Sequence, residues 1–200
     1  MKILIILNGE IKSETFLKNL AQKSDYIICA DGGYDKAKAA GVMPDLLLGD
    51  MDSVQAKDFD GKILQFPPEK DWTDCELALK TASDMQADEI VVTCALGGRC
   101  DHEMANLYVL SSFKNACIKE KDVSVYVCDS ELEFAGNGKV FSVLPLTDSV
   151  VSVSGAKYCT EKTLFKVGAS LGISNEATDS VTKVQVFEGK CLIFINESDR

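Results

Sequence analysis

Residues 45–54 read DLLLGDMDSV, an apolar run that ends at Gly49 and leads directly into two carboxylates, Asp50 and Asp52. Side chains two positions apart in an extended chain point the same way, so these charges repel each other unless a cation binds there. Asp74, at the start of a predicted helix, adds a third carboxylate. Carboxylates without clustered His or Cys suit a hard, partly hydrated cation such as Mg²⁺, shared with substrate phosphates. The pattern predicts a Mg²⁺ site; an Asp-rich turn beside a helix-capping acid is the simpler alternative.

Two glycine-containing stretches, ADGG at 30–33 and LGGR at 96–99, predict contacts to phosphate groups. Glycine lets backbone N–H groups approach an anion closely, and each stretch precedes a predicted helix N-terminus, where anions bind. Arg99 and Lys70 are the nearest cations: Arg99 can hold a phosphate through two hydrogen bonds, and Lys70 can act as a point charge. An ion pair with a neighbouring aspartate is an equally good role for either cation.

His102 is the single histidine of the chain. The stretch GGRCDHEMAN at 97–106 places it in the first turn of a helix, with Asn106 one turn later on the same face. A helix N-terminus disfavours the protonated imidazole. The pattern therefore indicates a substrate contact more than a general base, although a lone histidine is more often structural.

Strand and helix patterns that would position these residues alternate through the first 130 residues. The predicted strands are 2–7, 26–30, 46–48, 62–66, 89–95 and 123–128. The predicted helices are 13–22, 34–40, 74–85 and 101–113, and Thr73 with Glu76 forms a capping box. Near-continuous apolar strands between helices predict a mostly parallel sheet, which binds ligands at the carboxyl ends of its strands.

The pattern changes near residue 130 to short β-branched and aromatic segments, with a hairpin turn predicted at Asn137-Gly138. Such segments predict a small antiparallel β-domain. The expected fold class is α/β: a doubly wound, mostly parallel sheet domain over 1–130, followed by a small antiparallel β-sandwich domain over 131–200.

Composition narrows the class of protein. The chain is 46% hydrophobic and 26% charged, as expected for a globular protein, and its net charge of −10 without a basic stripe argues against a nucleic-acid partner. No apolar run approaches the roughly 20 residues that span a bilayer, so no membrane partner is expected. The eight cysteines show no C-x-x-C spacing, and the N-terminus lacks a signal-peptide cleavage site. Reduced thiols and a cytoplasmic location are expected.

Five segments together resemble the thiamine pyrophosphokinase (thiamin diphosphokinase) family. They are ADGG at 30–33, PDLLLGDMDS at 44–53, EKDWTD at 69–74, GGRCDHEMAN at 97–106 and GASLGISN at 168–175. Their order, and their spread over most of the chain, make the resemblance specific. It implies transfer of a pyrophosphoryl group from ATP to the hydroxyl of thiamine, giving AMP and thiamine diphosphate. It also implies an ATP-binding catalytic domain, a thiamine-binding β-sandwich and a homodimer with sites between subunits.

The resemblance assigns roles residue by residue. Mg²⁺ would be held by Asp50, Asp52 and Asp74. The catalytic group would comprise Lys70, Asp71, Arg99 and Asp101, of which Asp71 or Asp101 would accept the hydroxyl proton. The nucleotide would be bound by Asp31, Gly32, Thr73, His102 and Asn106. Thiamine would contact Ser174 and Asn175, in a loop shaped by Ser170 and Gly172, with Phe187 or Tyr158 as a stacking aromatic.

Two other interpretations stay open. A haloacid-dehalogenase-like phosphatase also has an apolar strand followed by D-x-D, whose first Asp is phosphorylated. That family usually carries the motif on its first strand, whereas here it lies on the third, and no clear acid pair follows. A nucleotide- or thiamine-sensing module is the second interpretation, and the retained acidic triad argues against it.

Overall fold

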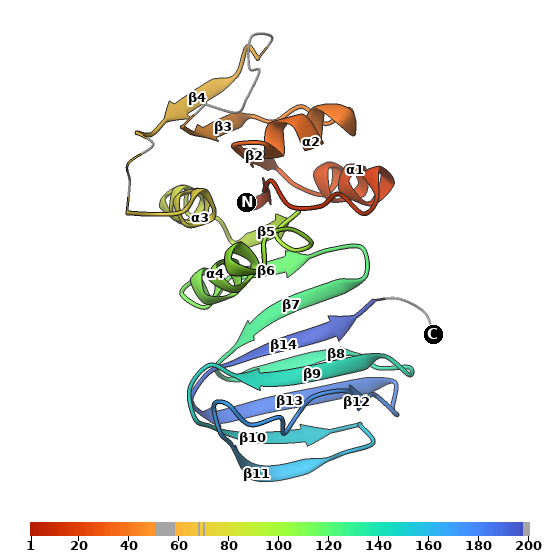
Figure 1. Ribbon diagram of the computed structural model, residues 1–200. Coiled ribbons are helices and arrows are strands. Elements are labelled where there is room, and N and C mark those ends of the chain that lie inside the picture. Colours follow the sequence, from red (N-terminus) through yellow and green to blue (C-terminus); the bar gives the residue numbers. More distant parts are fainter. Residues whose placement is uncertain (51–58, 68, 70, 198–200) are drawn as a thin grey trace. The chain divides into compact units, whose positions relative to one another are not determined.

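The computed structural model describes residues 1–50, 59–67, 69 and 71–197, and the chain divides into two compact units, Met1–Lys121 and Asp122–Arg200 (Figure 1). Residues 123–128, included in the first predicted domain, fall in the second unit. They form a strand that pairs antiparallel with residues 191–196 of that unit. Among the described residues, none of the helices has the length and apolar character that crossing a bilayer requires.

The first unit is built on parallel strands in the order β6-β5-β1-β2-β3-β4. Their bounds are β1 (Lys2–Ile6), β2 (Tyr26–Ala30), β3 (Leu46–Gly49), β4 (Lys62–Gln65), β5 (Glu89–Thr93) and β6 (Ala116–Lys119). From β1 the chain first adds strands on one side, as far as β4, and then crosses to add β5 and β6 on the other. The strand order therefore reverses between β1 and β5, which is the point where open α/β sheets bind ligands.

The helices of the first unit are α1 (Glu14–Gln22), α2 (Gly33–Ala39), α3 (Asp74–Asp84) and α4 (Cys100–Leu110). Crossovers between parallel strands are right-handed, so the change of direction after β4 puts α3 and α4 on the face opposite α1 and α2. Helices α3 and α4 also pack against each other (Figure 1). This doubly wound arrangement confirms the predicted fold class for the first unit.

The central strands of the first unit are buried on both faces. Leu46, Leu47 and Leu48 of β3 are all buried, as are Ile3 of β1 and Ile90 of β5. Strands covered on both faces read as continuous apolar runs, which explains why residues 46–48 are three consecutive leucines. Asp50, directly after this strand, is therefore delivered to the edge of the sheet by a rigid, buried strand.

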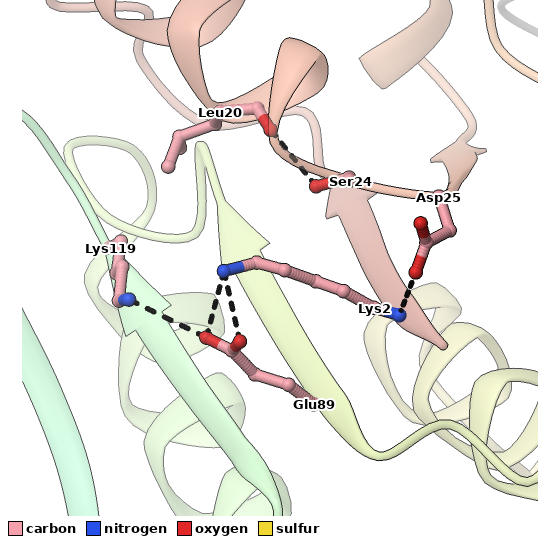
Figure 2. Close-up of polar contacts among 6 residues, drawn as sticks. All are labelled: Lys2, Leu20, Ser24, Asp25, Glu89 and Lys119. Carbon is pink, nitrogen blue, oxygen red and sulfur yellow. Dashed lines mark hydrogen bonds and ion pairs between the residues drawn. The ribbon is translucent and has the colours of Figure 1, made fainter.

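At the opposite, amino edge of this sheet a charged cluster ties neighbouring strands together (Figure 2). Lys2 Nζ lies 2.9 Å from Glu89 Oε2, and Lys119 Nζ lies 3.6 Å from Glu89 Oε1. The Lys2 backbone N–H donates to Asp25 Oδ2 at 2.7 Å. These contacts join β1, β5, β6 and the start of β2, so their role is to hold the strands in place.

The second unit holds antiparallel strands in the orders β12-β9-β14-β7 and β11-β10-β13-β8. Their bounds are β7 (Val123–Cys128), β8 (Glu131–Ala135), β9 (Val140–Pro145), β10 (Ser149–Ser154), β11 (Thr160–Phe165), β12 (Asn175–Glu176), β13 (Val181–Glu188) and β14 (Cys191–Asn196). One buried cluster takes Phe141 and Ile193 from the first group and Val151 and Val184 from the second. A shared core between two sheets confirms the predicted β-sandwich.

Asn137 and Gly138 form a turn in which both residues have positive φ, 54° and 83°. The prediction of a turn is confirmed, but the prediction of a hairpin is wrong, because β8 and β9 lie in different sheets. The turn instead hydrogen-bonds to a neighbouring loop: Asn137 N–H donates to Asp179 O at 3.1 Å, and Gly138 N–H to Ala177 O at 3.0 Å. It carries the chain from one sheet of the sandwich to the other.

Candidate active site

A crevice of about 390 Å³ lies at the carboxyl ends of β1, β2 and β5, where the strand order of the first unit reverses. Loops after these strands and the first turns of α3 and α4 line it. The lining residues are Leu7, Asn8, Gly9, Ala30, Asp31, Thr73, Asp74, Cys75, Cys94, Ala95, Gly98, Arg99, His102, Glu103 and Asn106. Two helix N-termini thus face a space edged by both acids and a guanidinium, which suits a phosphorylated ligand together with a cation.

The structure brings together most of the predicted nucleotide and phosphate residues. Those lining the crevice are Asp31, Thr73, Asp74, Arg99, His102 and Asn106. Of the other predicted residues, Gly32, Asp50, Asp71 and Asp101 are described but do not line it. Asp52 and Lys70 lie outside the described residues. Asn8 and Glu103 line the crevice and were missed: Asn8 belongs to none of the motifs, and Glu103 was passed over although it stands within GGRCDHEMAN.

Asp31 begins the loop after β2 in a left-handed conformation, with φ 45°, which is uncommon for a residue with a Cβ. Its N–H donates to Leu48 O at 2.9 Å, which continues the ladder between β2 and β3. Its carboxylate lies against the next strand end, where a Cβ at Gly49 would be 1.9 Å from Asp31 Oδ1. Asp31 and the acid that follows Gly49 are therefore neighbours at this edge, and strained backbone of this kind concentrates at functional sites.

The ADGG glycines serve close packing. A Cβ at Gly33 would lie 2.1 Å from Ile6 O, and one at Gly32 would lie 2.4 Å from Cγ and Oδ1 of Asn8. The start of α2 is thus pressed onto the end of β1. Gly32 leaves the space that the Asn8 carboxamide occupies at the crevice wall.

Helix α3 presents its N-terminus to the crevice because Thr73 caps it. The Thr73 hydroxyl accepts a hydrogen bond from Glu76 N–H at 3.2 Å, which is one of the two hydrogen bonds of the predicted capping box. The carboxylate of Glu76 instead pairs with Lys80, 2.8 Å away and one turn along. Lys80 Nζ also lies 4.4 Å from the ring centroid of Trp72. The cap places Asp74 in the first helical turn, where a negative charge is favourable.

Arg99 makes the ion pair with an aspartate that its sequence context allowed. Its Nη2 lies 2.7 Å from Asp101 Oδ2, and its Nε donates to Asp101 Oδ1 at 3.2 Å. Hydrogen bonding between them raises the pKa of Arg99 and lowers the pKa of Asp101. Both side chains are largely exposed, and exposed pairs are weak, so a phosphate group can replace Asp101 as the partner of the guanidinium.

The first turns of α4 hold the glycine loop in place. Asn106 is buried, and its side-chain amide donates to Ala95 O at 2.9 Å. Gly98 N–H donates to Glu103 Oε1 at 2.7 Å. His102, by contrast, is exposed at the crevice. Asn106 therefore positions the loop, while His102 is available to a ligand.

The predicted thiamine loop of the second unit is held firmly against β9. Val143 N–H donates to Gly172 O at 2.9 Å, and Ser174 N–H donates to Ser142 Oγ at 3.0 Å. Ser174 has φ 56°, so the loop adopts a strained turn there. Ser170 and Ser174 are exposed.

Asn175 has a different surrounding from Ser174. Its side chain is buried, and its amide is hydrogen-bonded to backbone groups: Oδ1 accepts from Tyr158 N–H at 3.0 Å and from Glu176 N–H at 2.9 Å, and Nδ2 donates to Tyr158 O at 2.8 Å. These bonds fix the segment that carries the exposed Tyr158 ring beside the predicted thiamine loop.

The acids of the crevice suit a hard cation. Asp31 and Asp74 both line it and offer carboxylate oxygens, which Mg²⁺ prefers when it also binds phosphates. Within the described residues no three His, Cys, Asp or Glu side chains are close enough to form a metal site by themselves. The donor set there fits a cation held by few protein ligands and completed by water and substrate.

A doubly wound sheet with an acidic, Arg-bearing crevice at its switch point, followed by a β-sandwich, defines the class of two-domain α/β enzymes that act on phosphorylated nucleotides. Two family models match the chain in order: "Thiamin pyrophosphokinase, catalytic domain" over residues 17–121 and "Thiamin pyrophosphokinase, vitamin B1 binding domain" over residues 128–191. The chain belongs to the thiamin pyrophosphokinase family.

Sequence relatives and solved structures agree with this family assignment. Thiamin pyrophosphokinase 1 of Caenorhabditis elegans is 28% identical over 89% of this chain and 82% of its own length. Thiamine pyrophosphokinase of Bacillus subtilis is 28% identical over 80% of this chain and 81% of its own. A crystal structure of the Bacillus subtilis enzyme matches with a TM-score of 0.85 at 25% identity, covering 100% of both chains. That of the Geobacillus thermodenitrificans protein matches with 0.83 at 26% identity, covering 100% of this chain and 98% of the other.

Proposed function

We propose that the chain makes thiamine diphosphate by transferring the pyrophosphoryl group of ATP to the hydroxyl of thiamine in the crevice of the first unit. The observation that carries this site assignment is the meeting of Asp31, Asp74 and Arg99 at the strand switch point, beside the N-termini of α3 and α4. Acids for a cation and a guanidinium for phosphate are the groups that pyrophosphoryl transfer requires.

The reaction is an in-line displacement. The hydroxyl oxygen of thiamine bonds to the β-phosphorus of ATP, the bond from that phosphorus to the α-phosphate oxygen breaks, and AMP leaves. The protein contributes mainly position and charge stabilisation. Arg99 exchanges its contact with Asp101 for oxygens of the transferred group, and Lys70, outside the described residues, adds a second positive charge. His102 and the crevice walls contact the nucleotide.

The hydroxyl proton goes to Asp71 or Asp101. Asp101 loses its partner when Arg99 turns to the phosphate groups, and Asp71 is exposed just before the cap of α3. Both carboxylates are therefore candidate proton acceptors.

Mg²⁺ would be held by Asp50, Asp74 and Asp52, the last outside the described residues. When bound, the cation would offset the negative charge of the phosphate groups. Asp31, whose carboxylate lies against Gly49, orients the acids beside it.

Thiamine is bound by the loop of the second unit that contains Ser170, Gly172 and Ser174. Asn175 acts by fixing the position of Tyr158, whose ring is exposed. Either Tyr158 or Phe187 is the stacking ring, and each has a lysine near it: Lys157 Nζ lies 5.8 Å from the ring centroid of Tyr158, and Lys162 Nζ lies 5.1 Å from that of Phe187.

A homodimer is part of the proposal. Helix α4, which borders the crevice, exposes Met104 and Tyr108 one turn apart, and the thiamine loop exposes Leu171 and Ile173. Apolar side chains beside a binding site are stabilised when a second subunit covers them. Size-exclusion mass over a range of concentrations tests this.

A cytoplasmic location is also proposed. All eight cysteines are free thiols, and six of them are buried. Such thiols persist in a reducing compartment, where ATP is also abundant.

Product analysis with thiamine, ATP and MgCl₂ tests the function. We expect AMP and thiamine diphosphate in equal amounts. Release of inorganic phosphate would indicate a phosphatase, and tight binding without product would indicate a sensor.

Arg99→Ala should lower kcat by about 100- to 1,000-fold, because it removes charge stabilisation of the transferred group. Lys18→Ala, at an exposed cation on α1 away from the crevice, is the control and should leave kcat unchanged. Equal activity of the Arg99→Ala and Lys18→Ala variants would contradict the assignment of the crevice as the active site.

A further inference from the structure

Glu120, directly after β6, is a buried carboxylate with no part in the chemistry described above. Its exposed fraction is 4%, and it does not line the crevice. Charged side chains are seldom buried to this degree unless their oxygens are hydrogen-bonded. Its hydrogen bonds therefore identify the part of the molecule that it stabilises.

Those hydrogen bonds come from the turn after β5, residues 94–96. Glu120 Oε1 accepts from Ala95 N–H at 2.8 Å, and Thr93 Oγ1 lies 3.4 Å from Oε2. Burial raises the pKa of Glu120, while backbone N–H donors of Cys94, Ala95 and Leu96 counteract this rise. The N–H side of this turn therefore faces the carboxylate of Glu120, with Ala95 N–H at hydrogen-bond distance, as backbone N–H groups elsewhere face a phosphate.

The carbonyl side of the same turn is also fully engaged. Cys94 O accepts from Gly9 N–H at 2.7 Å, and Leu96 O accepts from Glu10 N–H at 3.3 Å. Ala95 O accepts from the Asn106 side chain. Cys94 itself has φ 53°, a strained conformation that persists only where surrounding contacts impose it. The turn is therefore clamped between the end of β6, the loop after β1 and helix α4.

The clamped turn leads directly into residues 97–99. Gly98 and Arg99 line the crevice, and Cys94 and Ala95 form part of its wall. A shift of the turn would therefore move both the guanidinium and the adjacent glycine backbone. Misplacement of a binding group by about 1 Å can cost about 100-fold in rate.

We propose that Glu120 is a positioning residue for pyrophosphoryl transfer, which holds the 94–96 turn in its strained shape and thereby places Gly98 and Arg99 against the phosphate groups of ATP. This inference rests on the proposed function, because it takes the crevice to be the site of ATP binding. Glu120 touches neither ATP nor thiamine, and its effect passes entirely through the turn.

Both the negative charge of Glu120 and the length of its side chain matter for this role. A glutamine at position 120 keeps the shape but replaces one acceptor oxygen with an NH₂ group, which faces N–H and hydroxyl donors. An aspartate keeps the charge but is one methylene shorter, so it cannot reach all the donors that glutamate reaches.

The experiment compares Glu120→Gln and Glu120→Asp with the wild type by steady-state kinetics in ATP and in thiamine, well below the Tm of every variant. We expect kcat/KM for ATP to fall about 10- to 100-fold in Glu120→Gln, and less in Glu120→Asp. The KM for thiamine should change less than about twofold, because the thiamine loop lies in the other unit. Glu89→Gln is the matched control: it removes a carboxylate from the amino edge of the same sheet and should leave kcat/KM for ATP unchanged.

The outcomes separate this inference from the proposed function. A lower Tm for Glu120→Gln with wild-type kinetic constants would overturn the positioning role and leave a purely structural one. If Glu120→Gln does not fold, Glu120→Asp decides, and wild-type kcat/KM for ATP in that variant would overturn the inference. If Arg99→Ala also keeps wild-type activity, the proposed site itself fails. Loss of activity in Arg99→Ala together with the expected ATP defect in the Glu120 variants supports both.

Discussion

At the scale of single residues, two adjacent glycines perform different tasks. A Cβ at Gly33 would meet a backbone oxygen, Ile6 O, which cannot move without disturbing β1. A Cβ at Gly32 would meet the carboxamide of Asn8, a side chain that can swing aside. Asn8, however, lines the crevice. The first contact concerns stability and the second concerns binding.

Gly33→Ala should therefore cost about 1–3 kcal/mol of unfolding free energy, as overpacked cores do. Gly32→Ala should cost less stability but raise the KM for ATP several-fold, because Asn8 is displaced at the crevice wall. Urea unfolding and steady-state kinetics on both variants check this. The two variants serve as controls for each other, and equal losses of stability would contradict the distinction.

The same residues show what a sequence can and cannot reveal about a site. Asp31, Asp74, Arg99 and His102, which all line the crevice, were predicted because glycine-rich or acidic motifs surround them. Glu120 was missed because its partner Ala95 lies 25 positions away, and no local sequence pattern indicates the contact. Asn8 was missed for the same reason. Asn106 was predicted from GGRCDHEMAN, but its hydrogen bond to Ala95 O depends on which strand and helix ends the fold brings together. Local sequence motifs therefore cannot predict roles that depend on tertiary contacts.

At the scale of elements, the cap of α3 joins helix stability to the site. Thr73→Ala removes the hydroxyl that accepts from Glu76 N–H and should cost about 1 kcal/mol. It should also lower activity, because the first turn of α3 carries Asp74. Thr73→Ser keeps the hydroxyl and should restore both properties. Thermal unfolding with parallel assays measures them, and wild-type stability in Thr73→Ala would show that the cap contributes nothing.

The exact bounds of two strands were predicted correctly. Strands β2 and β7 have the predicted bounds, and the first unit is doubly wound as expected. Strand β6 was missed because ACIK is short and contains no β-branched residue besides Ile118. Helix α4 ends at Leu110 instead of 113, since residues 111–113 continue as a turn. Short elements take their structure from neighbours, which a single sequence does not show.

At the scale of the whole molecule, two glutamates at opposite edges of one sheet make the folding stability depend on pH in opposite directions. Burial raises the pKa of Glu120 above its ordinary value of 4.5. Partial burial also acts to raise the pKa of Glu89, but hydrogen bonds and charge from Lys2 and Lys119 outweigh it and lower that pKa below 4.5. The folded chain therefore holds the Glu120 proton more tightly than the unfolded chain does, and the Glu89 proton less tightly.

Linkage fixes the sign of each effect. The stability of the wild type relative to Glu120→Gln should be highest below pH 4.5 and fall as pH rises through the raised pKa. Relative to Glu89→Gln it should be highest above pH 4.5 and fall as pH drops through the lowered pKa. Subtracting the unfolding free energy of each variant from that of the wild type cancels the titration of groups that the substitution does not disturb. Urea unfolding of the three proteins from about pH 3.5 to 8 measures both differences. If both difference curves sloped the same way with pH, burial would not be what governs Glu120, and its carboxylate would be stabilised in the folded chain as that of Glu89 is.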